Sequence, residues 1–492
     1  DTVPPSRLPS HDLIDASADA RLRYARGQSL PDWLAMRSGA FGIFPDGVAY
    51  PKTQQEIRDI MDFATQHQCM LIPYGGGTSV AGHITPADQE RPIITVSLEK
   101  MNRLVDLDEV SQIATFGPGT KGPEIEAQLR PLGYLLGHFP QSYELSTVGG
   151  WVATRSSGQQ SWRYGHIEQM LAGCTLETYR GTLEVPAIPA SSAGLDLREM
   201  VMGSEGRFGV ISEVKVRVTP LPEAESFNVA FAPSWESAIA LARRAAQLKI
   251  PLSMLRLSNA IETRTQLALA GKPDAITWLE RYLKLRGVAA GKSMITFGLT
   301  GTKQQCKSAK SQLRRLFSEF GVVDMGSRLG DTWAHSRFRS PYLRQTLWSL
   351  GYAVDTLETA INWKDLPNAV DSIESAIRDA VPDLPVHVFT HLSHIYPQGA
   401  SIYTSYIFPN GPDYETTLGY WRAMKPAASQ AIVACGGTIS HQHGVGRDHS
   451  TYLAAEKGAL GIESMDVLAK HFDPDQQLNT GVLIDAQGKS DD

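Results

Sequence analysis

The spacing of hydrophobic and polar residues predicts short strands alternating with helices across residues 47–222. Residues 94–98 and 113–116 each have the composition of a short strand. Thr53-Gln-Gln-Glu56 has the sequence of a capping box, and the apolar residues after it recur on one face of a helix. Short strands between helices favour an α+β domain here over a doubly wound parallel sheet.

Longer pairs of strands and helices follow from about residue 223. Residues 227–232 predict a strand, and residues 234–248 predict a helix with its apolar side chains on one side. The same pair recurs at 294–299 and 303–320. Amphipathic helices beside strands bury their apolar faces on a sheet. We therefore expect a second domain that has an antiparallel sheet covered by helices and supplies a substrate pocket.

A glycine-rich stretch, Pro73-Tyr74-Gly75-Gly76-Gly77-Thr78-Ser79, follows the predicted buried strand 70–72. Glycine has no Cβ, so its backbone N–H can approach an anion closely, and the two hydroxyls add donors. The stretch is neither G-x-G-x-x-G nor a P-loop. A tight loop between strands is the alternative. The order strand, helix, strand and glycine loop favours a phosphate site.

Two further stretches combine hydroxyls with glycines. Ser142-Tyr-Glu-Leu-Ser-Thr147 runs into Gly149 and Gly150, and Thr154-Arg-Ser-Ser-Gly158 continues it. Gly203-Ser-Glu-Gly-Arg-Phe-Gly209 precedes a predicted strand at 210–212. The first of these stretches has too few apolar residues for a core strand, so it is either a polar surface loop or a second ligand contact.

Composition excludes several classes of protein. The chain has 492 residues, 42% of them hydrophobic and 20% charged, which is typical of a soluble globular protein of two or three domains. A net charge of −6 argues against a nucleic-acid surface. Four cysteines lie far apart, so we expect reduced thiols and a cytoplasmic location. No apolar run is long enough to span a bilayer, and the start, which lacks Met and a signal pattern, suggests a trimmed N-terminus.

Four segments together carry a family resemblance. In chain order they read PYGGGTSVAG, QSYELSTVGGWVATRSSG, MGSEGRFGVI and SHQHGVGRDH. They resemble the vanillyl-alcohol-oxidase-type flavoproteins with a PCMH-type FAD-binding domain, and within them the alkylglycerone-phosphate (alkyl-dihydroxyacetone-phosphate) synthases and their bacterial relatives. The likeness runs from about Arg21 to Leu483.

The resemblance implies a division of the chain into four parts. Residues 1–44 form an N-terminal arm, with a helical segment near 16–26, and 45–222 form a two-subdomain FAD-binding domain. Residues 223–430 form the cap, and 431–492 return to the FAD-binding domain.

The resemblance also implies tight, non-covalent FAD. Covalent attachment would need a nucleophilic side chain, for which Tyr74, His138 and His166 are the candidates. The residues implied to contact FAD are Pro73, Tyr74, Gly75, Gly76, Gly77, Thr78, Ser79, Gln141, Ser142, Ser146, Thr147, Gly149, Gly150, Thr154, Arg155, Ser156, Ser157, Glu205, Gly206, Gly209, Val210 and Ile211.

Reactive residues are carried over from the same resemblance. Tyr403 corresponds to the synthases' proton donor and acceptor, and a phenol needs nearby cations to act as a base at neutral pH. Arg256, Arg344, His441 and His443 could supply them. Arg344 matches the residue that contacts the substrate phosphate, a role suited to a guanidinium fork. An ion pair for Arg256 and a solvated helix face for Arg344 are the alternatives.

Gln442 is a departure from the family pattern, since synthases usually show three histidines here and this chain has His441-Gln442-His443. Gln442 would contact substrate, and its amide cannot carry a proton charge near pH 7.

A metal site is the competing interpretation of the histidines at 387, 391 and 394. Related flavin dehydrogenases of D-2-hydroxy acids use two histidines and a glutamate as ligands. Aligned on them, His394 keeps the first ligand, Tyr403 replaces the second and Gln442 replaces the glutamate. A phenol and a neutral amide are poor ligands for a divalent cation, so we expect no metal. His387 and His391 are then structural.

Three functions follow in order of preference. The first is an FAD-dependent exchange of the acyl group of acyl-dihydroxyacetone phosphate for a fatty alcohol, which in the resembled enzymes proceeds through a bond to flavin N5. The alternative is an oxidoreductase of a hydroxy acid or phenolic alcohol, and the third is a flavin-binding protein without turnover. We expect a small-molecule or lipid substrate, peripheral membrane contact, a homodimer and no nucleic acid.

Overall fold

A computed structural model describes residues 1–87, 90–270 and 273–484. The chain divides into two compact units, each described here by itself. Unit 1 comprises residues 1–157, 166–220 and 442–492, and unit 2 comprises 158–165 and 221–441. Unit 1 is therefore interrupted twice in the sequence, by the short segment 158–165 and by the long segment 221–441.

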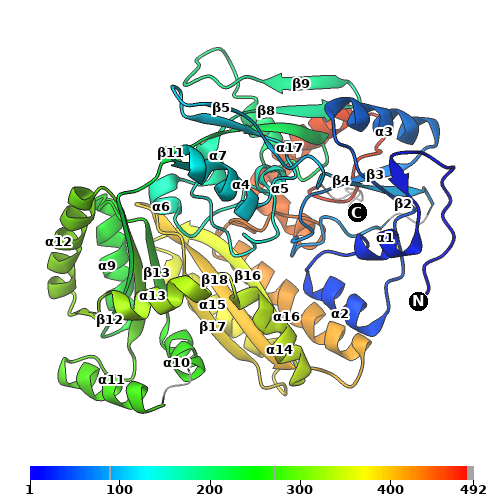
Figure 1. Ribbon diagram of the computed structural model, residues 1–492. Helices are drawn as coiled ribbons and strands as arrows, with labels where there is room; N and C mark the ends of the chain where they lie inside the picture. The colour runs from blue at the N-terminus through cyan, green and yellow to red at the C-terminus, as the bar shows by residue number, and fades with distance from the viewer. Residues whose placement is uncertain (88–89, 271–272, 485–492) are drawn as a thin grey trace. The chain divides into compact units, whose positions relative to one another are not determined.

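A four-stranded sheet carries the first half of unit 1 (Figure 1). Its order is β1-β2-β4-β3, and β2 and β3 both run parallel to β4. The side chain of Thr53 caps α3 by accepting a hydrogen bond from the Glu56 N–H, as the capping-box sequence predicts. The elements are β1 (Ile14–Asp15), α1 (Ala18–Arg23), α2 (Leu30–Ser38), β2 (Gly47–Ala49), α3 (Gln54–Gln66), β3 (Met70–Tyr74) and β4 (Ile93–Ser97).

Helix α3 forms the core of this half because its apolar face packs on the sheet. Ile57, Ile60 and Met61 on α3 are buried against Leu71 on β3 and Ile94 on β4. Burial of such side chains stabilises the fold by roughly 1.5–3 kcal/mol each. This packing fixes the end of β3, where the glycine stretch begins.

A five-stranded antiparallel sheet forms the second half of unit 1, in the order β5-β6-β10-β8-β9. Its strands and the small β7–β11 pair are β5 (Leu104–Asp108), β6 (Ile113–Phe116), β7 (Tyr134–Leu135), β8 (Leu171–Thr178), β9 (Gly181–Val185), β10 (Val210–Arg217) and β11 (Thr219–Pro220). The helices are α4 (Gly122–Leu129), η1 (Arg130–Leu132), α5 (Val148–Thr154), α7 (Ile167–Met170), α8 (Arg198–Val201), η3 (Ser450–Tyr452) and α17 (Leu453–Phe472).

The C-terminal segment is bound into unit 1 beside β3. The Leu71 N–H donates to the Gln477 carbonyl at 2.7 Å, and the Asn479 N–H donates to the Leu71 carbonyl at 2.9 Å. Buried Arg207 pairs with Asp473 at 3.4 Å and also donates to the Leu478 carbonyl. Residues 477–479 therefore lie beside β3, just before the glycine stretch, although they are distant from it in sequence.

Unit 2 is built on a seven-stranded, fully antiparallel sheet in the order β15-β12-β14-β13-β17-β18-β16. The strands are β12 (Ala224–Ala232), β13 (Met254–Ser258), β14 (Ser293–Gly301), β15 (Val323–Asp324), β16 (Tyr352–Asn362), β17 (His387–Leu392) and β18 (Gly399–Pro409). This confirms the antiparallel sheet expected from the alternation of strands and helices.

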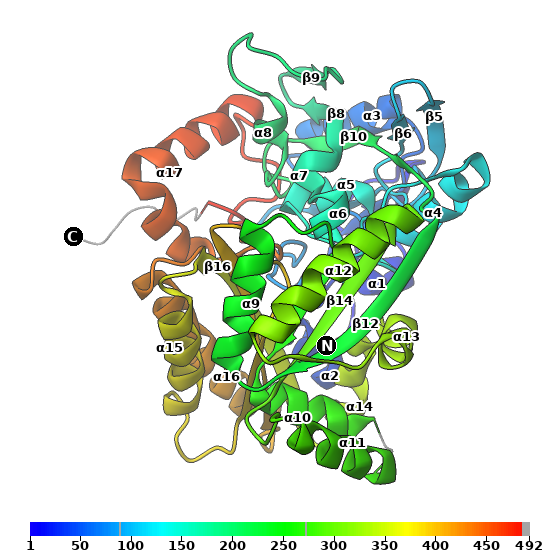
Figure 2. The ribbon, with the colours of Figure 1, turned by 90° about the vertical axis from the view of Figure 1, so that its left-hand side faces the viewer.

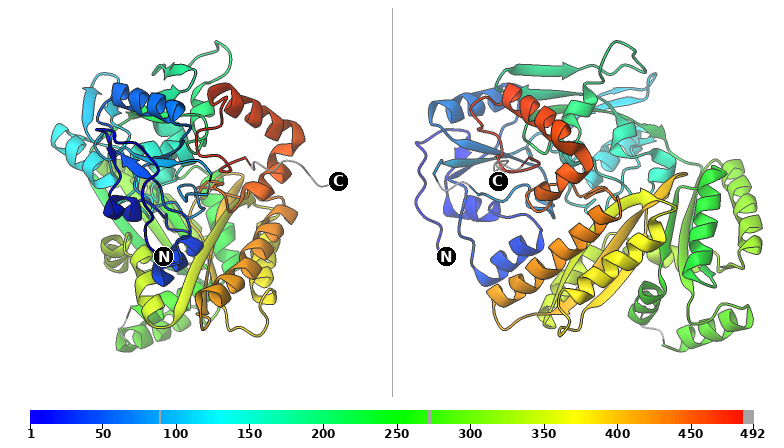
Figure 3. Two further views of the ribbon diagram at one scale, coloured as in Figure 1. Left: turned by 90° about the vertical axis from the view of Figure 1, so that its right-hand side faces the viewer. Right: turned by 180° about the vertical axis from the view of Figure 1, so that it is seen from behind.

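Helices cover that sheet. Figure 2 shows α9 and α12 side by side over β12 and β14, and Figure 3 shows α15 beside α16. The expected helices at 234–248 and 303–320 are confirmed as α9 (Trp235–Gln247) and α12 (Lys303–Glu319). The others are α6 (Ser161–Tyr164), α10 (Ala260–Leu269), α11 (Pro273–Leu285), α13 (Ser327–Ser336), η2 (Ser340–Tyr342), α14 (Leu343–Ser349), α15 (Leu366–Asp379) and α16 (Tyr414–Ala434).

Two boundaries differ from those expected. The sequence placed the cap at 223–430, whereas unit 2 runs from 221 to 441 and adds 158–165. The difference at its end arises because α16 continues to Ala434 and the next residues stay with the sheet, where the Thr438 N–H donates to the Ala360 carbonyl. Among the residues described, no helix combines the length and apolar character that a bilayer span requires.

Candidate functional site

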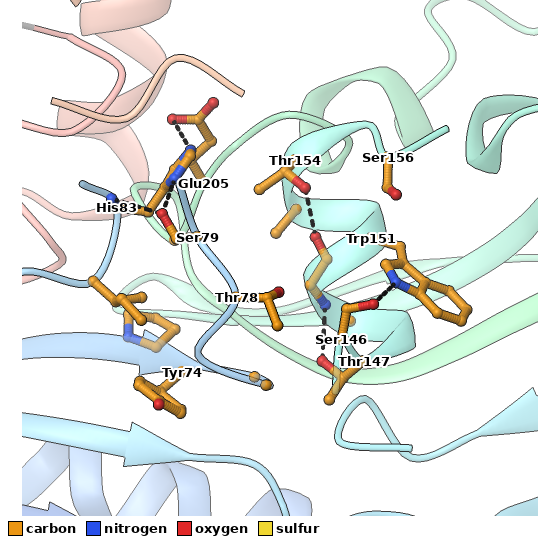
Figure 4. Close-up of a pocket in the computed structure, with 18 of the residues that line it drawn as sticks. Tyr74, Thr78, Ser79, His83, Ser146, Thr147, Trp151, Thr154, Ser156 and Glu205 are labelled. Carbon is orange, nitrogen blue, oxygen red and sulfur yellow. Dashed lines mark hydrogen bonds and ion pairs between the residues drawn. The ribbon is translucent and has the colours of Figure 1, made fainter. Parts of the chain in front are cut away.

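A deep pocket in unit 1 is lined by the glycine stretch, by the start of α5 and by the loop before β10 (Figure 4). It holds about 1050 Å³ of empty space, including the open mouth. Three segments that are separate in sequence therefore converge on one cavity.

Glycine is required in the stretch after β3 because another loop packs directly against it. A Cβ on Gly76 would collide with the carbonyl oxygen of Leu145, and one on Gly75 would collide with the side chain of Thr147. Gly77 adopts φ +71°, which favours glycine. The backbone of this stretch is thus brought against the 142–147 segment, and its N–H groups border the pocket.

The start of α5, which borders the pocket, is fixed by hydrogen bonds. Thr147 is the N-cap, and its hydroxyl accepts a hydrogen bond from the Gly150 N–H at 3.3 Å. Trp151 Nε1 donates to Ser146 Oγ at 2.8 Å, which fixes the loop before the helix. Thr154 Oγ1 donates to the Gly150 carbonyl at 2.9 Å. The N–H groups of Val148 and Gly149 donate to the carbonyls of Thr120 and Pro118, at 3.0 and 2.9 Å, so the first turn of α5 is held in place by the loop before α4.

A buried chain of polar side chains forms one wall of the pocket (Figure 4). Ser79 Oγ lies 2.6 Å from His83 Nδ1, and His83 Nε2 lies 3.1 Å from Glu205 Oε2. The Glu205 carboxylate also accepts hydrogen bonds from the N–H groups of Val445 and Gly446, at 2.6 and 2.8 Å. Glu205 thereby joins the glycine stretch to the loop that follows His443.

Most of the residues expected to contact FAD line this pocket. They are Pro73, Tyr74, Gly75, Gly76, Gly77, Thr78, Ser79, Ser142, Ser146, Thr147, Gly149, Gly150, Thr154, Ser156, Glu205, Gly206, Gly209 and Ile211. Gln442 and His443 join them. Gln141, Arg155, Ser157 and Val210 are not among the lining residues; Arg155, for example, pairs with Glu168 and Glu199.

Sequence reasoning missed several lining residues, of which His83 and Asn479 matter most for binding. Asn479 Nδ2 donates to the carbonyl oxygens of His83 and Glu205, at 2.8 and 3.3 Å. Its Oδ1 is buried without a hydrogen-bond partner in the described part of the chain. An orphaned buried acceptor at a pocket wall suits a ligand that carries an N–H, as a flavin ring does. The residues present therefore fit FAD.

The candidate attachment residues are all engaged within unit 1. His138 Nε2 lies 3.1 Å from Ser156 Oγ, and burial lowers the pKa of His138 to about 3. His166 Nδ1 lies 2.6 Å from Ser157 Oγ. Burial raises the pKa of Tyr74 to about 12, so its phenol is protonated near neutral pH. Tyr74 is thus not activated as a phenolate, and each of the two histidines is bonded to a serine.

Tyr403 lies on β18 within the sheet of unit 2. Its hydroxyl donates to Thr356 Oγ1 at 3.2 Å. Burial raises the pKa of Tyr403 to about 12; the charges of Glu358 and Asp355 act in the same direction, and the Arg256 charge opposes them. The phenol is therefore protonated in the resting protein, and added positive charge would be needed before it accepts a proton.

Arg256 forms an ion pair in unit 2. Its Nη2 lies 2.7 Å from Glu262 Oε1, and His391 Nδ1 lies 3.0 Å from the same oxygen. Burial opposes ionisation of Glu262, but the charges of Arg256 and His391 outweigh it and lower its pKa to about 2. The ion pair that was the alternative reading of Arg256 is thus present, and it holds the guanidinium at a fixed position beside His391.

Arg344 and His441 also belong to unit 2. Arg344 is the second residue of α14, and its charge, after that of Lys425, helps to hold the pKa of buried Asp355 below the ordinary value although burial opposes this. The backbone N–H of His441 donates to the Glu358 carboxylate at 2.9 Å.

The histidines at 387, 391 and 394 each hydrogen-bond to a different residue, namely Thr265, Glu262 and Ser161. Within the described ranges no three His, Cys, Asp or Glu side chains gather as a metal site.

Two family models match this chain. Residues 221–483 match the model for the C-terminal domain of FAD-linked oxidases, and residues 45–185 match an FAD-binding domain model. The first match covers more than half of the chain and contains Tyr403, Arg256 and both histidines at 441 and 443.

The proteins that are similar to this chain include synthases and dehydrogenases. The alkyldihydroxyacetonephosphate synthase of Trypanosoma brucei brucei is 29% identical, over 96% of this chain and 79% of its own length. A solved structure of alkyldihydroxyacetonephosphate synthase has a TM-score of 0.82 at 26% identity, over 97% of this chain and 85% of that one. The D-2-hydroxyglutarate dehydrogenase of Stutzerimonas stutzeri is 23% identical, over 91% of this chain and 92% of its own length.

Proposed function

The chain belongs to the family of FAD-linked oxidases defined by their C-terminal domain, and we propose that within it the protein is an alkyldihydroxyacetonephosphate synthase. It would exchange the acyl group of acyl-dihydroxyacetone phosphate for a long-chain alcohol and so form an ether bond. The observation that carries this proposal is similarity to synthases along nearly the whole chain, in sequence and in fold.

FAD is the cofactor, and when bound it supplies a ring that bonds to or exchanges electrons with a substrate carbon. The segments around Gly76, Thr147 and Glu205 would hold it, through backbone N–H groups and the buried Ser79–His83–Glu205 chain. These contacts involve backbone and neutral donors, so they suit tight binding without a covalent bond.

Tyr403 would move the proton on the substrate carbon. Its raised pKa means that a cation must come close before the phenol accepts a proton, and the Arg256 charge already acts in that direction. His443 would provide a further charge when protonated. General acid–base groups of this kind contribute about 10²–10⁴-fold to a rate.

Arg344 and Gln442 would select the substrate. A guanidinium recognises a phosphate with two parallel hydrogen bonds, which supports the assignment of the substrate phosphate to Arg344. Gln442 offers one donor group and one acceptor but no charge. It would therefore recognise a neutral part of the substrate where synthases usually place a histidine.

Oxidation of a hydroxy acid is the second candidate, and the 23% identity to D-2-hydroxyglutarate dehydrogenase favours it. That identity is lower than for the synthase, over a similar share of the chain. Tyr403 and Gln442 also stand where those dehydrogenases place metal ligands, which weakens this candidate.

One anaerobic experiment distinguishes the two candidate functions. Purified FAD-loaded protein is mixed either with acyl-dihydroxyacetone phosphate and a fatty alcohol or with D-2-hydroxy acids. A synthase forms an ether lipid and leaves the flavin oxidised at the end of turnover. Stable flavin reduction by a hydroxy acid, without ether formation from the first mixture, would overturn the proposal.

The lipid substrate would reach the protein at a membrane surface. Trp278 and Leu285 on α11 are 70% and 86% exposed, and the cations Arg281 and Arg286 lie over neighbouring aromatic rings. Aromatic and basic side chains on one helix favour the surface of an anionic bilayer. Co-sedimentation with anionic vesicles, lost in Trp278→Ala, would support this contact, and equal pelleting of both proteins would contradict it.

The assembly and cellular location complete the proposal. We expect a homodimer, which light scattering of the purified protein would test against a monomer mass. All four cysteines are free in the described structure, and this supports a reducing cytoplasm. Cell fractionation with a tagged chain would test that location.

A further inference from the structure

Three side chains in unit 2 lie one after another: the phenol of Tyr396 shares a hydrogen bond with His441, and the carboxylate of Glu358 lies on the far side of the imidazole. Tyr396 Oη lies 2.5 Å from His441 Nε2. On the other side of the imidazole, His441 Nδ1 lies 3.6 Å from Glu358 Oε2. A carboxylate, an imidazole and a hydroxyl therefore follow one another, in the same order as in a hydrolase triad but with a phenol at the end.

The arrangement selects one tautomer of His441. A carboxylate beside Nδ1 stabilises a proton on that nitrogen, so Nε2 is left as the acceptor for the Tyr396 hydroxyl. Glu358 is held in turn by the N–H of His441 and by the Ser440 hydroxyl, at 2.9 Å each. His394 packs its ring 4.9 Å from that of His441.

The backbone around Tyr396 is fixed as well. Its N–H donates to the Gly399 carbonyl at 2.8 Å, and its own carbonyl accepts from Trp363 Nε1 at 3.1 Å. These contacts hold the short connection between β17 and β18. The phenol is therefore presented by a rigid turn and not by a mobile loop.

Solvent exposure increases from Glu358 through His441 to Tyr396. The Glu358 side chain is 2% exposed, that of His441 is 8% exposed, and Tyr396 is partly exposed. The phenol is thus the most exposed of the three groups.

We infer that Tyr396, backed by His441 and Glu358, is the base that activates the incoming alcohol, an inference that rests on the proposed exchange reaction. The acyl group leaves as a carboxylate with its electron pair. As the alcohol oxygen bonds to the substrate carbon, its O–H bond breaks and the proton passes to the Tyr396 oxygen. The Tyr396 proton moves to His441 Nε2, the imidazolium lies beside Glu358, and the proton then returns to water.

The test separates the two halves of the exchange. Fatty-acid release from acyl-dihydroxyacetone phosphate is measured in one turnover without alcohol, and ether formation is measured with hexadecanol. Tyr396→Phe should release acid at the wild-type rate and form ether about 10²–10⁴-fold more slowly. A more acidic alcohol, trifluoroethanol, needs less help from a base, so it should recover most of the loss in Tyr396→Phe.

Matched variants decide between chemistry and structure. Glu358→Gln keeps an acceptor for the His441 N–H but removes the charge, and it should slow ether formation in the same direction. Tyr406→Phe removes a buried phenol on β18 that donates to Asp355, and it should leave the ratio of the two half-reactions unchanged. Equal loss of both half-reactions in Tyr396→Phe, or an unchanged rate of ether formation, overturns the inference. Absence of acid release in the wild type would instead refute the proposed function, and the inference with it.

Discussion

The ring of His391 stacks on the ring of Tyr403, with their centroids 4.7 Å apart and their planes inclined by 16°. The two residues are paired across β17 and β18, so the strand register itself sets the contact. His391 is in turn bonded to Glu262. The phenol of Tyr403 is thus held on its ring face by His391 and at its hydroxyl by Thr356.

The first prediction is that Tyr403→Phe keeps the fold and the flavin but loses turnover. Phenylalanine preserves the stacked ring and removes only the hydroxyl, so stability should change by about 1 kcal/mol or less. If Tyr403 transfers the proton, fatty-acid release should fall about 10²–10⁴-fold. Single-turnover acid release and flavin content measure this, and a wild-type rate would end the assignment.

The second prediction concerns acid stability through Glu262. The folded pKa of about 2 lies below the unfolded value of roughly 4.3, so this pair stabilises the fold fully above that value. The contribution is lost as the pH falls from about 4.3 to about 2. Glu262→Gln leaves Arg256 without its charge partner and should cost about 3–5 kcal/mol at pH 7.

Urea unfolding of wild type and Glu262→Gln at pH 7 and pH 3 measures this difference. The difference in free energy of unfolding between wild type and Glu262→Gln should be smaller at pH 3 than at pH 7. Glu280→Gln is the control, because that carboxylate pairs with Lys292 but is 41% exposed. If the difference in free energy of unfolding is the same at both pH values, Glu262 stabilises the fold through packing and not through its charge.

The sequence predicts most of the fold because the hydrophobic spacing is local. The capping box at Thr53 and the helices α9 and α12 could all be placed within a residue or two. The pairing of Leu71 with Leu478, by contrast, joins residues some four hundred positions apart, and no local pattern encodes it.

The candidate site, like the fold, could be predicted from the sequence only in part. Glycines and hydroxyls marked the pocket, because ligand-binding backbone needs those residue types in consecutive positions. His83, Asn479 and Tyr396 were missed because each has a partner that is distant in sequence. Only the fold brings His83 to Glu205 and Tyr396 to His441.

The third prediction is that acid precipitation releases all of the FAD. His138 is buried with a pKa near 3 and bonded to Ser156, and Tyr74 stays protonated because burial raises its pKa to about 12. Tyr74 is therefore not a phenolate, and the His138 imidazole, although neutral, is held by its bond to Ser156. The measurement is flavin absorbance in the supernatant, and a yellow pellet after denaturation would implicate Tyr74, His138 or His166.

The fourth prediction is that chelators leave activity unchanged. His387, His391 and His394 hydrogen-bond to three different residues, and the Tyr403 phenol and the Gln442 amide are poor ligands for a divalent cation. Turnover with and without EDTA, followed by addition of zinc or manganese, tests this. Loss with EDTA and recovery with metal would return oxidation of a hydroxy acid to first place.

The last prediction concerns Gln442, which lines the pocket beside His443. Gln442→His restores the three histidines usual in synthases and introduces a group that can be charged near neutral pH. A charge beside the pocket should favour a substrate with more negative charge, so the ratio of rates between two substrates should change, while the rates need not rise together. The pair to compare is acyl-dihydroxyacetone phosphate and its unphosphorylated ester. Gln442→Asn is the control, because it keeps the neutral amide, shortens the side chain and should lower both rates alike. If Gln442→His raises or lowers both rates by the same factor, Gln442 does not select the substrate.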